Sequence, residues 1–160
     1  MSDQRQYAHF VKAAPPYTEE RPSSLWRRSG DDWEFLSLLD WGWHTTGRPP
    51  MPGALFPVTA ERAAALAADR QGWVRYWAFH PSERRWRAGE GPSTVVRRRS
   101  SPERVHDETF MRGGVWKPDG AVSEFFDVRQ TNPPHLEELT AEGAERLLRE
   151  LFGVMGATDL

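Results

Sequence analysis

A chain of 160 residues with no cysteine and a net charge of −2 has the size of one compact domain. Without cysteine it can form no disulfide, and it offers neither a thiolate metal ligand nor a nucleophilic thiol. The small net charge predicts no overall field that would gather nucleic acid or anionic lipid. Hydrophobic residues make up 38% of the sequence, which is enough to fill an interior and argues against disorder over most of the length.

The N-terminal sequence MSDQRQYAHFVKAAPPY lacks the apolar run of a secretory signal, and no stretch is apolar over the length that a bilayer requires. We therefore expect a cytoplasmic protein that has no membrane partner. All basic residues except Lys12 and Lys117 are arginine, a skew that is typical of proteins encoded by GC-rich bacterial genomes.

The chain is expected to begin with an arm. Residues 1–23 carry three prolines among polar residues, which favours an extended segment over a helix. We expect residues 24–160 to form a single domain that follows this arm.

A β-hairpin is predicted next. The segments 25–28 and 33–38 are aromatic and aliphatic, and between them Gly30 and Asp31 supply turn chemistry. The run WEFLSLLDWGWH continues the second strand or begins a third one near Asp40.

Two principal helices are predicted, Thr59–Arg70 and Thr140–Phe152. In each, the threonine is a suitable N-cap, and a glutamate lies in the first turn, where the helix dipole favours negative charge. In the second helix, apolar residues recur at spacings of three and four, which predicts one buried stripe and a role in core packing. Residues 121–128 are expected to form one or two further helical turns.

Between these helices the sequence favours strands. The segment 73–79 is bulky on both alternating faces, which predicts a central strand, and STVVRRR and RVHDETFM follow as two more. We interpret SERRWRAGEGP as a polar turn region and GGVWKPDG as a loop. The predicted fold is therefore α+β, a mostly antiparallel sheet of about five to seven strands with both principal helices on one face.

The two helix starts suggest a tandem β-β-α pseudo-repeat. LFPVTAERAAALAADR from Leu55 and LEELTAEGAERLLREL from Leu136 share six of sixteen aligned positions. Each is preceded by an arginine-bearing strand, a second strand, and a tryptophan before a proline-containing loop, namely Trp43 and Trp116. The alternative is convergence, because Thr-Ala-Glu is simply good helix-start chemistry. Both interpretations stay open at this point.

Catalytic and metal-binding motifs are missing. None of the five histidines has a metal-ligand spacing, and we expect neither a metal nor another cofactor. The sequence contains no GxSxG, GxxxxGK[ST] or GxGxxG motif, so the usual signatures of serine hydrolases and nucleotide-binding proteins are absent. His106 and Glu108 alternate onto one strand face, and with His44 they are the only candidates for acid–base chemistry that we single out.

Tryptophan is the most unusual feature of the composition. Eight indoles exceed what a core of this size commonly holds, because each buried N–H needs a partner, so some should be partly exposed. Trp41 and Trp43 would share a strand face beside His44, and Trp77 lies on the predicted central strand. The competing interpretation is that Trp41 and Trp43 merely cap the core.

Arginines on the VVRRRSSPER strand supply further candidate contacts. Arg97 and Arg99 alternate onto one face and Arg98 onto the other. A simpler interpretation is that they protect an edge strand from aggregation. Because no aromatic residues interleave with them, nucleic acid is not expected as a partner.

These features favour a non-enzymatic module that binds another protein, of the adaptor, immunity or regulatory kind. The predicted anchors, all of types that are enriched at interfaces, are Trp41, Trp43, Trp77, Arg97 and Arg99. The alternative is a small-molecule binder or enzyme with a pocket lined by tryptophans, in which His44 or His106 acts as the general base with Glu108.

Overall fold

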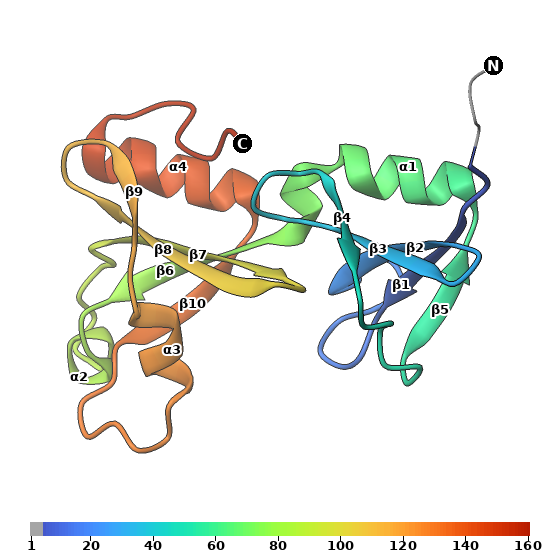
Figure 1. Cartoon of the computed structure of the whole chain (residues 1–160). Coiled ribbons are helices and arrows are strands. Elements are labelled where there is room, and N and C mark those ends of the chain that lie inside the picture. The colour runs from blue at the N-terminus through green and yellow to red at the C-terminus, as the bar shows by residue number, and fades with distance from the viewer. Residues whose placement is uncertain (1–4) are drawn as a thin grey trace. The chain divides into compact units, whose positions relative to one another are not determined.

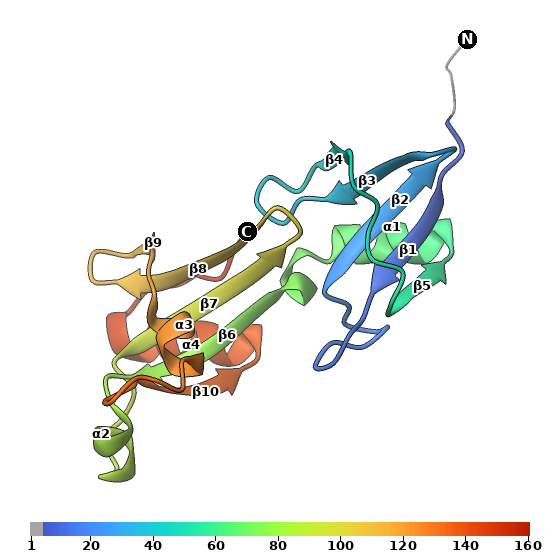
Figure 2. The ribbon, with the colours of Figure 1, turned by 60° about the horizontal axis from the view of Figure 1, so that its bottom comes forward.

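The computed structural model describes residues 5–160, and their contacts divide the chain into two compact units. The first unit comprises the chain as far as Trp73 together with Ser100–Val105, and the second comprises Val74–Arg99 with His106–Leu160. Each unit contains one five-stranded antiparallel sheet and helices (Figures 1 and 2). The predicted α+β class is therefore confirmed, although the strands form two sheets rather than one.

The first unit is a sheet followed by a helix. Its strands are β1 (Ala8–Lys12), β2 (Ser24–Ser29), β3 (Asp32–Leu36), β4 (Trp43–Thr46) and β5 (Leu55–Val58). They are ordered β4-β3-β2-β1-β5, so four strands follow one another as a meander and the fifth returns to pair with the first. The chain then enters α1 (Ala60–Ala68) and the short 3-10 turn η1 (Arg70–Trp73).

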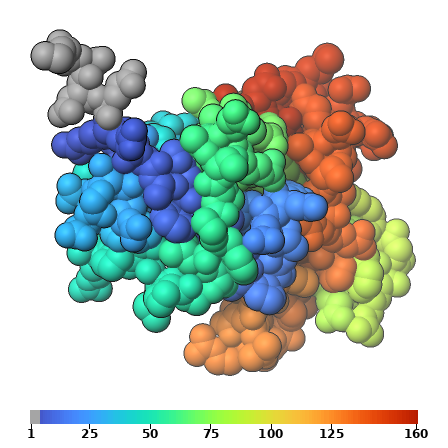
Figure 3. All heavy atoms as spheres, turned by 90° about the vertical axis from the view of Figure 1, so that its right-hand side faces the viewer, coloured from blue at the N-terminus to red at the C-terminus, as the bar shows by residue number. Residues whose placement is uncertain are grey.

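Helix α1 begins where the sequence predicts, because the hydroxyl of Thr59 accepts a hydrogen bond from the backbone N–H of Arg62 at 3.0 Å. After the helix, the indole N–H of Trp73 donates to the carbonyl of Leu66 at 2.8 Å. In Figure 3 the mid-blue connection between β1 and β2 lies against the green helix, where the guanidinium of Arg62 donates to the carbonyl of Glu20 at 3.2 Å. The buried core of this unit consists of Val11, Leu25, Leu36, Leu38, Ala63, Leu66 and Trp73.

The second unit has the same strand order with helices inserted in two of its connections. Its elements are β6 (Val74–His80), α2 (Glu83–Arg87), β7 (Thr94–Ser101), β8 (Arg104–Met111), β9 (Val115–Pro118), α3 (Ala121–Phe126), β10 (His135–Leu139) and α4 (Ala141–Phe152). The sheet order β10-β6-β7-β8-β9 is again a meander of four strands whose first member also pairs with the fifth. The final helix again follows that fifth strand directly.

Helices cover both faces of the second sheet. On one face, α4 begins at Thr140, whose hydroxyl accepts from the backbone N–H of Gly143 at 3.0 Å, and it buries Ala144 and Leu148. The helix ends at Gly153, which has a left-handed φ of 68° that glycine adopts without steric cost. The other face is covered by α3, which buries Trp77.

Several sequence predictions are corrected by these strands. Residues 1–23 were expected to form an arm, but 8–12 form β1 between β2 and β5, with Val11 fully buried; residues 1–4 lie outside the described part. The domain expected over residues 24–160 is divided between the two units. GGVWKPDG contains the short strand β9, and SERRWRAGEGP contains α2.

The matching strand orders bear on the predicted pseudo-repeat. In each unit the last strand, β5 or β10, pairs with the first strand of the meander. It is followed by a threonine that caps the principal helix, Thr59 before α1 and Thr140 before α4. Good helix-start chemistry alone does not account for a matching order of five strands. Duplication of the gene segment nevertheless stays a prediction.

Capping of α4 gives a first testable expectation. Replacing Thr140 with alanine removes the acceptor for one N–H of the first turn and should lower the free energy of unfolding by about 1 kcal/mol. Replacing it with serine keeps a hydroxyl acceptor and should leave stability close to wild type. Urea unfolding followed by circular dichroism measures both variants, and equal midpoints for alanine and serine would contradict the capping role.

Candidate functional site

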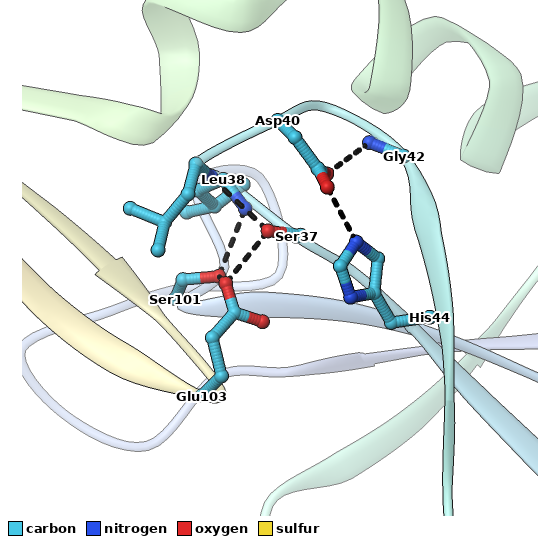
Figure 4. A network of polar contacts seen from close by, with 8 residues as sticks. Ser37, Leu38, Asp40, Gly42, His44, Ser101 and Glu103 are labelled. Atoms are coloured by element: carbon cyan, nitrogen blue, oxygen red, sulfur yellow. Dashed lines mark hydrogen bonds and ion pairs between the residues drawn. The ribbon is translucent and has the colours of Figure 1, made fainter.

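The turn between β3 and β4 carries Trp41 and is held by side-chain contacts to Asp40 (Figure 4). The Asp40 carboxylate accepts from the backbone N–H of Gly42 at 2.9 Å and lies 2.7 Å from Nε2 of His44. Both contacts lower the pKa of Asp40, and the hydrogen bond from Gly42 has the larger effect. Asp40 is therefore ionised at neutral pH. Trp41 itself has a left-handed φ of 61°, which is unfavourable for a residue with a Cβ and shows that the turn is strongly constrained.

A second polar network fixes the end of β3 (Figure 4). One carboxylate oxygen of Glu103 accepts from the hydroxyls of Ser37 and Ser101, each at 2.6 Å. The Ser101 oxygen in turn accepts from the backbone N–H of Leu38 at 2.8 Å. Because Ser37 and Leu38 are buried, this network positions the chain immediately before the turn that carries Trp41.

These networks contain a serine, a histidine and carboxylates, but they are not arranged as a catalytic triad. The hydroxyl of Ser37 donates to Glu103, whereas the imidazole of His44 is paired with Asp40. Ser37 is also only 1% exposed, so a substrate has no access to its hydroxyl. The arrangement therefore stabilises a turn and does not activate a nucleophile.

Trp43, the first residue of β4, lies over a partly buried ion pair. The guanidinium carbon of Arg27 is 4.2 Å from the centroid of the Trp43 ring and 4.0 Å from that of Tyr7, so the cation is enclosed between two rings. Its Nη2 lies 2.9 Å from the carboxylate of Glu34, and this hydrogen bond is the main cause that lowers the pKa of Glu34. Burial, followed by the charge of Arg27, lowers the pKa of His9, whose ring is 6.3 Å from that of Trp43.

Trp41 and Trp43 are both half-buried and both pack on the core of the first unit. Arg70 at the start of η1 lies over Trp41, with 5.3 Å between its guanidinium carbon and the ring centroid. The sequence placed these two indoles on one strand face, but only Trp43 belongs to the strand, and Trp41 lies in the preceding turn. Among the described residues, neither indole N–H has a hydrogen-bond acceptor.

Trp77 is not available as an exposed anchor. Its side chain is 3% exposed and packs against Ala121 and Val122 of α3 in the second unit. At this exposure Trp77 offers almost no surface to a partner protein, and its assignment to a binding site or pocket stays a prediction. When helices cover both faces of a sheet, a bulky residue on a central strand is buried on either face. The sequence did not reveal that α3 would cover the face that carries Trp77.

Arg97 and Arg99 also lie inside the second unit rather than at an edge. Strand β7 is the middle strand of its sheet, so the interpretation of a protective edge strand is wrong. Arg97 is 7% exposed, and its Nε donates to Glu108 at 3.0 Å. Nη2 of Arg99 donates to the same carboxylate oxygen at 3.2 Å, and burial lowers the pKa of Arg99. Arg98 pairs with Asp107 on the opposite face, as the alternation predicted.

The candidate acid–base pair of His106 and Glu108 lies on one face, as predicted, with 3.6 Å between Nε2 and the carboxylate. That carboxylate, however, is already neutralised by Arg97 and Arg99. Both guanidinium groups bind the same carboxylate oxygen that lies nearest to His106, so the pair is suited to a structural role.

Two further searches covered the described part of the chain. Within residues 5–160, no three His, Asp or Glu side chains are grouped so that they could hold a metal ion. No helix in the same range is both long and apolar enough to cross a membrane.

The sequence and the fold were also compared with known proteins. The chain matches no protein-family model, no curated protein and no solved structure. Any functional proposal therefore rests on the geometry described above.

Glu34 makes stability depend on pH. Its pKa in the folded state is lowered below the ordinary value of 4.5, so its contribution is fully present above that value and is lost as the pH falls through the lowered pKa. We expect the free energy of unfolding to fall more steeply on acidification below about pH 5 in wild type than in Glu34→Gln. Urea titrations at several pH values measure this, and parallel pH profiles would exclude the pair with Arg27 as the cause.

The Glu103 network gives a second stability prediction. Glu103→Ala leaves the buried hydroxyls of Ser37 and Ser101 without their acceptor and should lower the free energy of unfolding by about 1–3 kcal/mol. A matched control is Glu90→Ala, because the Glu90 carboxylate accepts from Arg85 on the surface and its loss should cost at most about 1 kcal/mol. Thermal unfolding compares the two, and equal losses would contradict the positioning role of Glu103.

Proposed function

We propose that this protein is a non-catalytic module, of the adaptor, immunity or regulatory kind, that binds another protein through the first unit. The proposed contact region, called the indole surface below, consists of Tyr7, Arg27, Trp41, Trp43 and Arg70. The single observation that supports it most is that Trp41 and Trp43 are half-buried, held by packing, and have no acceptor for their N–H groups within the described residues. Half-buried indoles with a spare donor are typical of interface hot spots.

The indole surface is organised before any partner binds. Trp43 is held by Arg27, which is in turn held by Glu34, and Trp41 is held by Arg70 and by the constrained turn. Fixed side chains lose little conformational entropy on association, so more of the contact energy contributes to affinity. Tyrosine, tryptophan and arginine supply a large contact area with few rotatable bonds exposed.

Charge at the indole surface favours a protein partner over nucleic acid. Of the two guanidinium groups at the indole surface, that of Arg27 is paired with Glu34, so at most that of Arg70 is available to a phosphate group. His44 beside the turn is likewise paired with ionised Asp40. The alternative of an enzyme or small-molecule binder is favoured by no comparable observation, because Trp77 is buried and the candidate bases are held in ion pairs.

Substitution of the two indoles tests the proposal. We expect Trp41→Ala combined with Trp43→Ala to abolish capture of the native partner, since each hot-spot side chain typically contributes about 2 kcal/mol. The control is Trp33→Ala, because Trp33 is also half-buried in the first unit but lies on the opposite face of the sheet. Capture from native lysate, followed by a binding isotherm with the identified partner, measures the effect.

The outcome is interpreted only for variants whose circular dichroism spectrum and unfolding midpoint show a folded chain. Equal partner affinity in wild type and in the folded double variant would contradict the proposal. Loss of binding in Trp33→Ala alone would move the interface to the other face of the sheet and contradict it as well.

A further inference from the structure

The first unit contains a constellation of four side chains on four neighbouring strands. His9 on β1 pairs with Arg27 on β2, which in turn pairs with Glu34 on β3. Trp43 on β4 lies opposite Leu36 of β3. Arg27 bonds Glu34 at 2.9 Å and lies 4.2 Å from the Trp43 ring centroid, while the rings of His9 and Trp43 are 6.3 Å apart. The half-buried indole lies at one end of the array.

The second unit contains the same constellation at matching strand positions. Tyr76 and Arg97 are register partners on β6 and β7, and Trp116 on β9 lies opposite Phe110. Arg97 lies 2.9 Å from Glu108 and 4.1 Å from the Trp116 ring centroid, while the rings of Tyr76 and Trp116 are 6.3 Å apart. The two sets therefore agree in strand and in geometry, but Tyr76 stands in place of His9, and in the second unit Arg99 adds a second cation to the carboxylate.

In the second unit, the constellation is occupied by the chain's own C-terminal segment. The indole N–H of Trp116 donates to the backbone carbonyl of Ala157 at 2.7 Å. The next residue, Thr158, is 7% exposed, and its backbone N–H donates to Glu145 of α4 at 3.3 Å. The N–H of Gly156 donates to the same carboxylate. A short segment of small residues thus binds against the indole and the helix through its backbone.

In the first unit, no segment among residues 5–160 makes the equivalent contact with Trp43. After α1 the chain turns into η1 and buries Trp73 in the core, so it does not return to Trp43. Trp43 Nε1 has no acceptor among residues 5–160. The carboxylate that holds the C-terminal segment has no counterpart in the first unit. Glu145 lies five residues after Thr140, the N-cap of α4, and the equivalent position after Thr59, the N-cap of α1, is Ala64.

We propose that the first unit binds a segment of a partner protein made of small residues, with a backbone carbonyl that accepts a hydrogen bond from Trp43 Nε1. The C-terminal segment in the second unit is the basis for this proposal, because its Ala157 carbonyl accepts the corresponding hydrogen bond from Trp116. The inference rests on the proposed function and specifies its partner chemistry. Recognition through the backbone needs no particular partner side chain, but it requires small residues that can approach the ring closely.

The test uses the full-length chain and a peptide with the sequence of residues 153–160, acetylated at its N-terminus. Indole N–H signals in ¹⁵N spectra are assigned with Trp43→Phe and Trp116→Phe. Added peptide should shift the Trp43 signal saturably and leave the Trp116 signal in place, because the protein's own segment already occupies Trp116. Trp43→Phe keeps an aromatic ring but loses the donor, so the dissociation constant, measured by isothermal titration, should rise roughly five-fold or more.

Trp33→Phe is the matched control and should bind the peptide as wild type does. A Trp43 signal that stays unmoved at millimolar peptide overturns the inference, as does an unchanged dissociation constant in Trp43→Phe. If the native partner is lost with the double alanine variant but retained at full affinity by Trp43→Phe, the binding function stands and the backbone contact is refuted. If both the double alanine variant and Trp43→Phe keep the native partner at full affinity, the proposed function and this inference are both overturned.

Discussion

The partly buried ion pair between Arg27 and Glu34 is the constraint on which the proposed surface depends. It holds a guanidinium in place against the rings of Tyr7 and Trp43, so the indole rests on a fixed cation instead of a mobile side chain. Removing Glu34 would leave this guanidinium without its carboxylate and would loosen the support of the indole. The same pair neutralises the arginine, whereas the indole N–H of Trp43 has no acceptor among residues 5–160.

In the second unit, the corresponding side chains are covered by the chain's own C-terminal segment. Arg97 and Glu108 repeat the pair, Arg99 adds a second cation to the same carboxylate, and the C-terminal segment satisfies the indole of Trp116. One unit therefore uses its indole to fold its own chain, whereas the other leaves its indole available. The proposed division between a structural unit and a binding unit would account for the different environments of these similar side chains.

Local signals in the sequence were sufficient for the two principal helices and for the hairpin of β2 and β3. Thr59 and Thr140 cap the helices because the capping chemistry is contained within one turn. Strand order was not readable, and so Arg97 was assigned to an edge although β7 is the middle strand. Strand β1 was missed because the prolines that follow it outweighed its short apolar pattern.

The candidate site was only partly predictable for the same reason. Clustering in the sequence identified Trp41 and Trp43, but nothing local showed that Arg27 and Tyr7 would enclose the second indole or that α3 would cover Trp77. These contacts depend on the pairing of strands distant in sequence. A signal did exist in the arginine and tryptophan that precede each principal helix, since Arg27 with Trp43 and Arg97 with Trp116 turn out to be equivalent.

The most direct test of this account is the rate at which individual indole N–H protons exchange with water, measured by nuclear magnetic resonance on the unliganded chain. The account predicts fast exchange for Trp43, whose donor has no acceptor within the described chain, and strong protection for Trp116, whose donor is bound to the Ala157 carbonyl. Equal protection of the two protons would contradict it, because the first unit would then have no spare donor with which to bind a partner.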